Sequence, residues 1–425
     1  MRNTVLFAII LSFFIVSTHL TAFAKADKTN HPVYMVHGVL GWTKAMGFGT
    51  HYFGDDLGTF AGDACDSFFE MKCNRKINKK QVVHEVKLTS LQNTYVRGFE
   101  LYKEINKTHI LEKICEFVNK PVQEVDDMNL VEIKNLIASI PVANRPFINI
   151  IAHSQGTIDS RYAAKLLADR YGYPVVKVLV SVSGCHRGSG IANTMYKLKE
   201  SNILLYSTMM WFFEKMWCGI ISGEFKSGKE SIGEEMLKSM AYYDIDDSDG
   251  RDTGIKHFND NVPLSDKHVA KYVSFMTARK KSQLSIPMQA LIFLSGDIDG
   301  NVYEMDSDKL DTCDRENTSS LNDDDGFIPI YSQHIGTRMR YKRNYFKDDK
   351  VSEISWTGIV TNADIVDRVQ MGDPELNGMD GVIDIGHFQE ITLPFGILTN
   401  GFRGLHFDEL GYYSAMIDYI AKNDN

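Results

Sequence analysis

Short apolar segments alternate with longer amphipathic segments along much of the chain. The apolar segments lie close to proline or glycine, as expected for strands of a parallel sheet that is covered on both faces. They are Val33–Val36, Ile148–Ile151, Val175–Val182 and Ala290–Leu294. We predict that each forms a buried strand.

The longer segments between them have helical spacing. Phe99–Val118 places apolar residues three or four positions apart, and Ile158–Tyr171 ends directly before Gly172, which is typical of a capped helix. Strands that alternate with helices indicate an α/β fold in which helices flank a mostly parallel central sheet.

Two regions interrupt this alternation. Leu204–Ile221, within residues 190–250, is rich in methionine, tryptophan and phenylalanine. It fits either a core helix or a helical lid that covers its apolar face until it meets lipid. Residues 340–400 are rich in aspartate and glycine, and we expect mainly solvated loops there.

The first 24 residues have the pattern of a secretory signal peptide. Arg2 precedes the apolar run Val5–Val16, and Ala22–Ala24 supplies a small-residue cleavage site. The apolar run is shorter than the roughly 20 residues that a membrane-spanning helix needs. We therefore predict a secreted protein whose mature chain, residues 25–425, forms one domain without a transmembrane span.

Charge and cysteine content narrow the class of protein. The formal net charge of −9 over 425 residues argues against a nucleic-acid partner, because phosphate binding requires a basic face. The six cysteines of an exported chain permit disulfides without assigning them. Cys65 and Cys73, which bracket a short loop, are the favoured pair.

A candidate nucleophile follows the second predicted strand in the sequence NIIAHSQG, residues 149–156. Ser154 has Ala152 two positions before it and Gly156 two positions after it, and a predicted helix comes next. Small residues at these places let strand and helix pass closely around a serine at the apex of a sharp turn. The context indicates a nucleophile elbow, although alanine replaces the usual first glycine.

The first predicted strand leads into a candidate oxyanion loop. The sequence VYMVHGVLGW, residues 33–42, ends the strand in His37 and Gly38. In hydrolases that carry a nucleophile elbow, one backbone N–H from such an early loop and one from the residue after the nucleophile bind the oxyanion. We assign these donors to Val39 and Gln155, and we expect His37 to be structural.

Several further motifs occur in a fixed order, and together they resemble the secreted triacylglycerol lipases of the Pseudomonas and Burkholderia type, which are α/β hydrolases. The similar segments span residues 33–340 and resume near 403–412. They are VHGVLGW (Val36–Trp42), YVRGFELY (Tyr95–Tyr102), SVSGCHRGSGIA (Ser181–Ala192), TGIKHFNDNVP (Thr253–Pro263) and DGFIPIYSQHIG (Asp325–Gly336). The resemblance implies an α/β-hydrolase fold with a helical lid at about 190–250.

The resemblance also implies the acid and the base. The acid of the family stands directly before glycine, which selects Asp325 from a run of three aspartates. The base must follow the acid in this fold, so it is His334, His387 or His406. His406 is favoured because it matches the H-x-D pattern of the family. The interval from Asp325 to His406 is longer than the family shows, which implies that residues 340–400 are an insertion.

The same H-x-D pattern implies a structural calcium ion. Asp408 and Asp306, with Asp308 as the alternative to Asp306, match the aspartates that bind calcium in the family. Oxygen ligands of this type suit Ca²⁺. The resemblance further implies a lipase-specific foldase and a secretion system as candidate partners.

The sequence therefore predicts a carboxylic ester hydrolase that cleaves acylglycerols through an acyl-enzyme on Ser154. A phospholipase or a short-chain esterase with the same triad is the alternative within this class. An inactive hydrolase fold that serves as a surface-binding protein is the alternative from another class.

Overall fold

The computed structural model describes part of the chain. It comprises residues 28–39, 41, 52–53, 81–186, 188–213, 232–241, 254–277, 325–328, 330–333, 345–346, 359–360, 382–383, 387 and 409–425.

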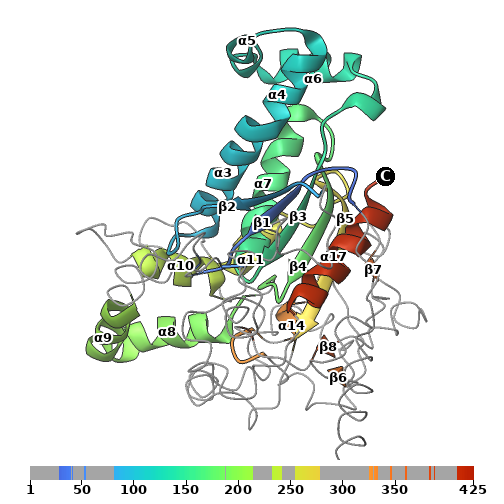
Figure 1. The fold of residues 1–425 in the computed structure, drawn as a ribbon. Coiled ribbons are helices and arrows are strands. Elements are labelled where there is room, and N and C mark those ends of the chain that lie inside the picture. Colours follow the sequence, from blue (N-terminus) through green and yellow to red (C-terminus); the bar gives the residue numbers. More distant parts are fainter. Residues whose placement is uncertain are drawn as a thin grey trace, which may run out of the picture.

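Parallel strands form the centre of the fold (Figure 1). They pair in the order β2–β1–β3–β4–β5, and β8, β6 and β7 extend the sheet beyond β5, where β7 is antiparallel to it. The strands are β1 (Val33–Val36), β2 (Val83–Val86), β3 (Ile148–His153), β4 (Val176–Val182), β5 (Val269–Thr277), β6 (Tyr345–Phe346), β7 (Ile359–Val360) and β8 (Val382–Ile383). The predicted α/β fold with a mostly parallel sheet is confirmed.

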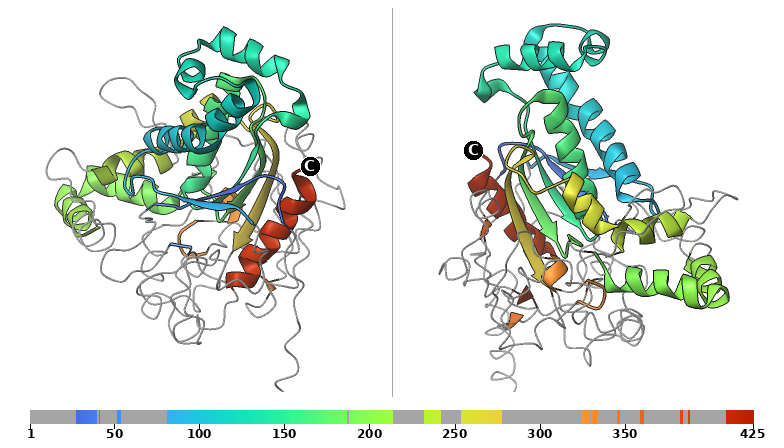
Figure 2. Two further views of the ribbon diagram at one scale, coloured as in Figure 1. Left: turned by 45° about the horizontal axis from the view of Figure 1, so that its top comes forward. Right: turned by 180° about the vertical axis from the view of Figure 1, so that it is seen from behind.

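Helices cover both faces of this sheet. Figure 2 shows α3 and α7 on one face and α17 on the other. The helices outside the 190–261 region are α3 (Thr94–Ile105), the π-helical turn η1 (Asn106–Ile110), α4 (Leu111–Val118), α5 (Val122–Asp126), α6 (Leu130–Ser139), the 3-10 turn η2 (Val142–Asn144), α7 (Gly156–Tyr171), α14 (Ile330–Gln333) and α17 (Glu409–Asn423).

The apolar segments of the sequence form the central strands because both faces of the sheet are covered. Every residue of β1 and β3 is buried, and β4 is buried except for one intermediate position. The predicted strands at 33–36, 148–151 and 175–182 are thus confirmed to within two residues at each end. The predicted strand Ala290–Leu294 lies outside the described residues.

Local signals also set the helix ends. The side chain of Asn93 accepts a hydrogen bond from Val96 N–H and caps the start of α3. Gly172 ends α7 in the left-handed conformation, with a φ of 77°. The predicted helix at 99–118 is part of a longer helical stretch that begins at Thr94 and continues through η1 into α4.

The 190–261 region adds helices beside the carboxyl ends of the strands (Figure 1). They are α8 (Gly190–Ser201), α9 (Ile203–Phe213), α10 (Ile232–Met240) and α11 (Ile255–Asn261). Met195 of α8 and Leu237 of α10 join a buried cluster with Ile158 of α7. In contrast, Leu204 and Trp211 of α9 expose 76% and 60% of their surface, so this part of the region is not a core helix.

Within the described ranges, no helix has the length and apolar character that a membrane crossing requires. Cys115 and Cys185 are buried free thiols. The other cysteines, including the predicted pair Cys65 and Cys73, lie outside the described residues, as does the predicted signal peptide at 1–24.

Candidate active site

Ser154 occupies the turn between β3 and α7, at the carboxyl end of a central strand. Its φ of 55° lies in the left-handed region, which is rare and strained for a residue with a side chain. The Ser154 N–H donates to Val182 O of the neighbouring β4 at 2.9 Å, which holds the turn against the sheet. This backbone has the geometry of a nucleophile elbow.

Close packing around the turn explains the small residues on either side of it. A Cβ atom on Gly156 would lie 2.7 Å from the carbonyl oxygens of both Val36 and His37, so a larger residue would push α7 away from β1. Ala152 is fully buried between β1 and β4, where Val36 and Ser181 are its strand partners. The methyl group of Ala152 fits in this space, so the glycine that usually stands two positions before the nucleophile is not required.

A buried chain of hydrogen bonds runs from Ser154 to two residues that are distant in the sequence. Ser154 Oγ lies 3.0 Å from His387 Nε2, and His387 Nδ1 lies 2.7 Å from Asp325 Oδ2. Each of the three side chains is at most 1% exposed. A carboxylate, an imidazole and a serine hydroxyl in this order can make the hydroxyl nucleophilic.

The Asp325 carboxylate is oriented by donors on both of its oxygens. Oδ1 accepts from the N–H groups of Phe327 and Ile328 at 2.9 and 2.8 Å. Oδ2 accepts from Gln333 Nε2 at 3.1 Å in addition to its contact with His387. The Gln333 amide also bonds to both backbone groups of Thr277 at the end of β5, so the acid is tied to the sheet.

The contacts of His387 determine the role of each ring nitrogen. A carboxylate can only accept a hydrogen bond, so Nδ1 carries a proton toward Asp325, and Nε2 then faces the Ser154 hydroxyl as the acceptor. The His387 N–H also donates to Asp325 O at 2.8 Å. The ring stacks on Phe327, with centroids 5.2 Å apart, and lies 4.6 Å from the ring of His153.

Arg97 holds the loop after β1, which the sequence predicts to carry an oxyanion donor, through two backbone carbonyls. Its Nη2 donates to His37 O at 2.7 Å and to Gly38 O at 3.2 Å. The N–H and C=O of a trans peptide point in opposite directions. With Gly38 O turned toward Arg97, the Val39 N–H points away from the guanidinium.

A buried ion pair anchors Arg97 itself. Arg97 Nε lies 2.6 Å from Asp159 Oδ2 on α7, and both side chains are fully buried. Burial raises the pKa of Asp159 to about 7, although the nearby Arg97 favours the charged carboxylate. Removing one partner of such a buried pair costs roughly 3–5 kcal/mol, because the other charge is left uncompensated. The pair therefore joins the loop after β1 to α7, the helix that follows Ser154.

His37 has a structural place in this loop, as the sequence suggested. Leu88 N–H donates to its Nε2 at 3.1 Å, so its Nδ1 is the atom that donates to Gly38 O at 2.9 Å. Burial, together with the positive charge of Arg97, lowers the pKa of His37 to about 3. The ring is thus neutral at ordinary pH and serves to connect β1 to the segment after β2.

The structure brings together part of the site that the sequence predicted. Ser154 and Asp325 lie in one hydrogen-bonded chain, Val39 lies in the loop held by Arg97, and Gln155 is the N-cap residue of α7. The histidine in this chain is His387, which the sequence ranked below His406. His406 and His334 lie outside the described residues.

The predicted calcium ligands, which are Asp306, Asp308 and Asp408, lie outside the described residues. Within the described residues, no cluster of three or more His, Cys, Asp and Glu side chains has the arrangement of a metal site.

Comparison with known proteins identifies the fold. No protein-family model and no curated protein sequence matches the chain. Among solved structures, the chain is similar to the Staphylococcus hyicus lipase, at 12% identity and a TM-score of 0.50, over 94% of this chain and 98% of that one. EstA from Clostridium botulinum is 13% identical with a TM-score of 0.46, and the coverage is 95% of this chain and 90% of that one. Lipase 1 from Pelosinus fermentans is 13% identical with a TM-score of 0.44, and the coverage is 93% and 99%. The first of these likenesses, with the sheet described above, shows an α/β-hydrolase fold.

Proposed function

We propose that the protein is a carboxylic ester hydrolase that uses Ser154 as nucleophile, His387 as general base and Asp325 as the acid that orients the base. The observation that carries this proposal is the continuous chain from Ser154 Oγ through His387 to Asp325 at the apex of the strained turn. His387 thus replaces His406, which the sequence favoured, as the proposed base.

The reaction proceeds by two acyl transfers. His387 Nε2 takes the proton of Ser154 as Oγ attacks the ester carbonyl carbon, and the tetrahedral intermediate forms. The imidazolium returns this proton to the leaving alcohol as the ester C–O bond breaks. Water, deprotonated by the same nitrogen, then attacks the acyl-enzyme. The imidazolium returns this proton to Ser154 Oγ as the bond from Oγ to the acyl carbon breaks and the carboxylic acid leaves. Asp325 stabilises the imidazolium in both halves of the reaction and keeps Nδ1 protonated.

The N–H groups of Val39 and Gln155 are the proposed oxyanion donors. Gln155 directly follows the nucleophile at the start of α7, and the hold of Arg97 on Gly38 O supports the assignment of Val39. Donors that are fixed before the reaction stabilise the negative charge without a reorganisation cost at the transition state.

The Asp325→Asn substitution is expected to lower kcat by about 10⁴-fold with little change in KM. The amide nitrogen can donate to His387 Nδ1, which favours the tautomer whose Nε2 carries the proton and cannot accept one from Ser154. Steady-state kinetics on a soluble p-nitrophenyl ester would measure the effect. A decrease of less than tenfold in a variant that melts like the wild type would contradict the assigned role.

Exposed apolar residues support a lipid ester as the substrate. Ile203, Leu204, Leu205 and Trp211 of α9 all expose more than 45% of their surface, beside the carboxyl ends of the strands. Such a surface suits contact with an aggregated lipid. We therefore propose that the 190–250 region acts as a lid and that the substrate is an acylglycerol, as in the secreted lipases of the Pseudomonas and Burkholderia type.

Two assays test this function together. A rapid burst of p-nitrophenol, stoichiometric with enzyme and followed by slow turnover, is expected for an acyl-enzyme on a substrate whose deacylation is limiting. Emulsified triacylglycerols are expected to be cleaved faster than dissolved short-chain esters and faster than phosphatidylcholine vesicles. A preference for phosphatidylcholine would favour the phospholipase alternative, and a lack of all hydrolysis would favour the surface-binding alternative.

The calcium site remains a prediction from the resemblance, with Asp306 and Asp408 as the proposed ligands. Chelation with EDTA is expected to lower the melting temperature by about 5 °C, because a cation that binds only the folded state stabilises it. Added Ca²⁺ should restore the original value, and added Mg²⁺ should not. Melting curves that coincide with and without chelator would contradict the calcium proposal.

Export remains a proposal as well. A signal peptide at residues 1–24 would direct the chain out of the cytoplasm, with a foldase and a secretion system as proposed partners. N-terminal sequencing of the exported protein is expected to give a start near Lys25.

A further inference from the structure

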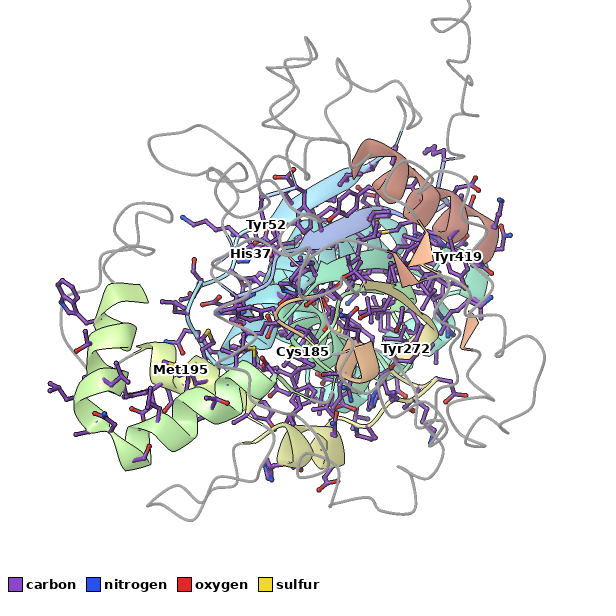
Figure 3. The ribbon with its side chains drawn as sticks, turned by 90° about the horizontal axis from the view of Figure 1, so that it is seen from below. His37, Tyr52, Cys185, Met195, Tyr272 and Tyr419 are labelled. Carbon is purple, nitrogen blue, oxygen red and sulfur yellow. The ribbon has the colours of Figure 1, made fainter. Side chains whose placement is uncertain are left out.

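One tyrosine hydroxyl bridges the oxyanion loop and the nucleophile elbow. Gly38 N–H donates to the hydroxyl oxygen of Tyr52 at 3.1 Å. The same oxygen lies 2.6 Å from His153 Nδ1, which is a second hydrogen bond. Tyr52 is 2% exposed, and its ring packs beside His37, as Figure 3 shows, with centroids 5.6 Å apart.

The two partners of Tyr52 directly adjoin functional residues. Gly38 immediately precedes Val39, which carries one proposed oxyanion donor. His153 immediately precedes Ser154, and the other proposed donor, Gln155, comes next. The hydroxyl of Tyr52 therefore links the two chain segments that must stay a fixed distance apart if two N–H groups are to converge on one oxygen atom.

The packing shows how close this link lies to the nucleophile. A Cβ atom on Gly38 would be 2.6 Å from Ser154 Cβ and 3.1 Å from the Tyr52 hydroxyl oxygen. The hydroxyl and the serine thus border the same small space. Arg97 holds the carbonyl of Gly38, and Tyr52 holds its N–H, so both polar groups of this residue are fixed.

We propose that Tyr52 is a positioning residue for the oxyanion hole, and that its hydroxyl sets the spacing between the Val39 and Gln155 donors. This inference rests on the proposed ester hydrolase function. Tyr52 acts through Gly38 and His153 and does not itself bind the substrate. Because oxyanion donors act over short distances, a displacement of about 1 Å can cost about 100-fold in rate.

The Tyr52→Phe variant tests the proposal, because it removes only the bridging oxygen. We expect kcat on a soluble p-nitrophenyl ester to fall about 10- to 100-fold, with KM within about twofold of the wild type. The matched control is Tyr173→Phe, which also removes a buried tyrosine hydroxyl, one that donates to Pro146 O at 2.7 Å. That variant is expected to keep kcat within about twofold of the wild type.

A second readout separates positioning from a general loss of structure. The thionoester analogue places a large, weakly accepting sulfur where the oxyanion forms, so a well-formed hole favours the ester strongly. The ratio of kcat/KM for ester over thionoester is expected to fall about tenfold in Tyr52→Phe and to stay unchanged in Tyr173→Phe. His153→Phe, which keeps a ring beside His387 but removes Nδ1, is expected to lower the ratio as well.

The outcomes distinguish this inference from the function on which it rests. An active wild type together with an unchanged ester-to-thionoester ratio in both Tyr52→Phe and His153→Phe would overturn the role of Tyr52 alone. A wild type that cleaves neither ester would overturn the proposed function.

Discussion

Replacement of Ser154 by alanine is expected to lower kcat for ester hydrolysis by about 10⁶-fold. Without Oγ, no acyl-enzyme forms, and His387 has no hydroxyl to deprotonate. The fold should persist, because alanine lacks only the hydroxyl oxygen. The hydrogen bond from the backbone N–H of residue 154 to Val182 O stays in place. Initial rates on a p-nitrophenyl ester, with thermal melting on the same samples, measure both quantities.

Ser160→Ala is the matched control. Ser160 is also a fully buried serine, on the same helix that follows the elbow, and its hydroxyl donates to Gly156 O at 2.7 Å. We expect this variant to keep kcat within about twofold of the wild type. Equal activity of Ser154→Ala and the wild type would show that another group carries the chemistry.

His387→Ala is expected to have a loss of similar size, about 10⁶-fold in kcat, because the base and the nucleophile act as one unit. His406→Ala is expected to leave kcat within about threefold of the wild type. The two variants should be assayed side by side on the same ester. The reverse pattern, with His387→Ala active and His406→Ala inactive, would show that the H-x-D resemblance identified the base correctly and that the contact of His387 with Ser154 is not catalytic.

The sequence was most informative where one local pattern determines one local structure. The apolar run before Ser154, the small residues around it and the helix that ends at Gly172 are sufficient to specify β3, the elbow and α7. The steric limit at Gly156 comes from the carbonyl oxygens of Val36 and His37, but it falls on one position of the elbow motif, so the sequence shows it as a glycine two positions after Ser154. The same holds for β1 and β4, which are short apolar runs that become buried strands.

The proposed base could not be found in this way, because the contact of His387 with Ser154 is a long-range property of the fold. His387 reaches Ser154 across 233 positions of the chain, and its nearest sequence neighbours match no motif of the lipase resemblance. The hydrogen-bonded chain that supports the proposed role forms only when β3, the Asp325 turn and residue 387 come together. The lipase resemblance rests on short motifs, and it favoured His406 because that residue lies in an H-x-D motif.

Other features depend on tertiary packing in the same way. Strand β5 was not predicted, since Lys271 and Ser274 interrupt its apolar pattern, yet pairing with β4 makes it an interior strand. The apolar run in α9 reads equally well as core or lid, and only its exposure separates the two. The bridging hydroxyl of Tyr52 left no local signal either, because its partners are 14 and 101 positions away.

Ester hydrolysis by this protein is proposed to depend above all on the activation of Ser154 by His387. The most direct test of this activation is labelling of the native protein with a fluorophosphonate, followed by mass mapping of the modified peptide. We predict one label per chain on Ser154 in the wild type and in His406→Ala, and no label in Ser154→Ala or His387→Ala. An unlabelled wild type, or a label that persists in Ser154→Ala, would contradict the account.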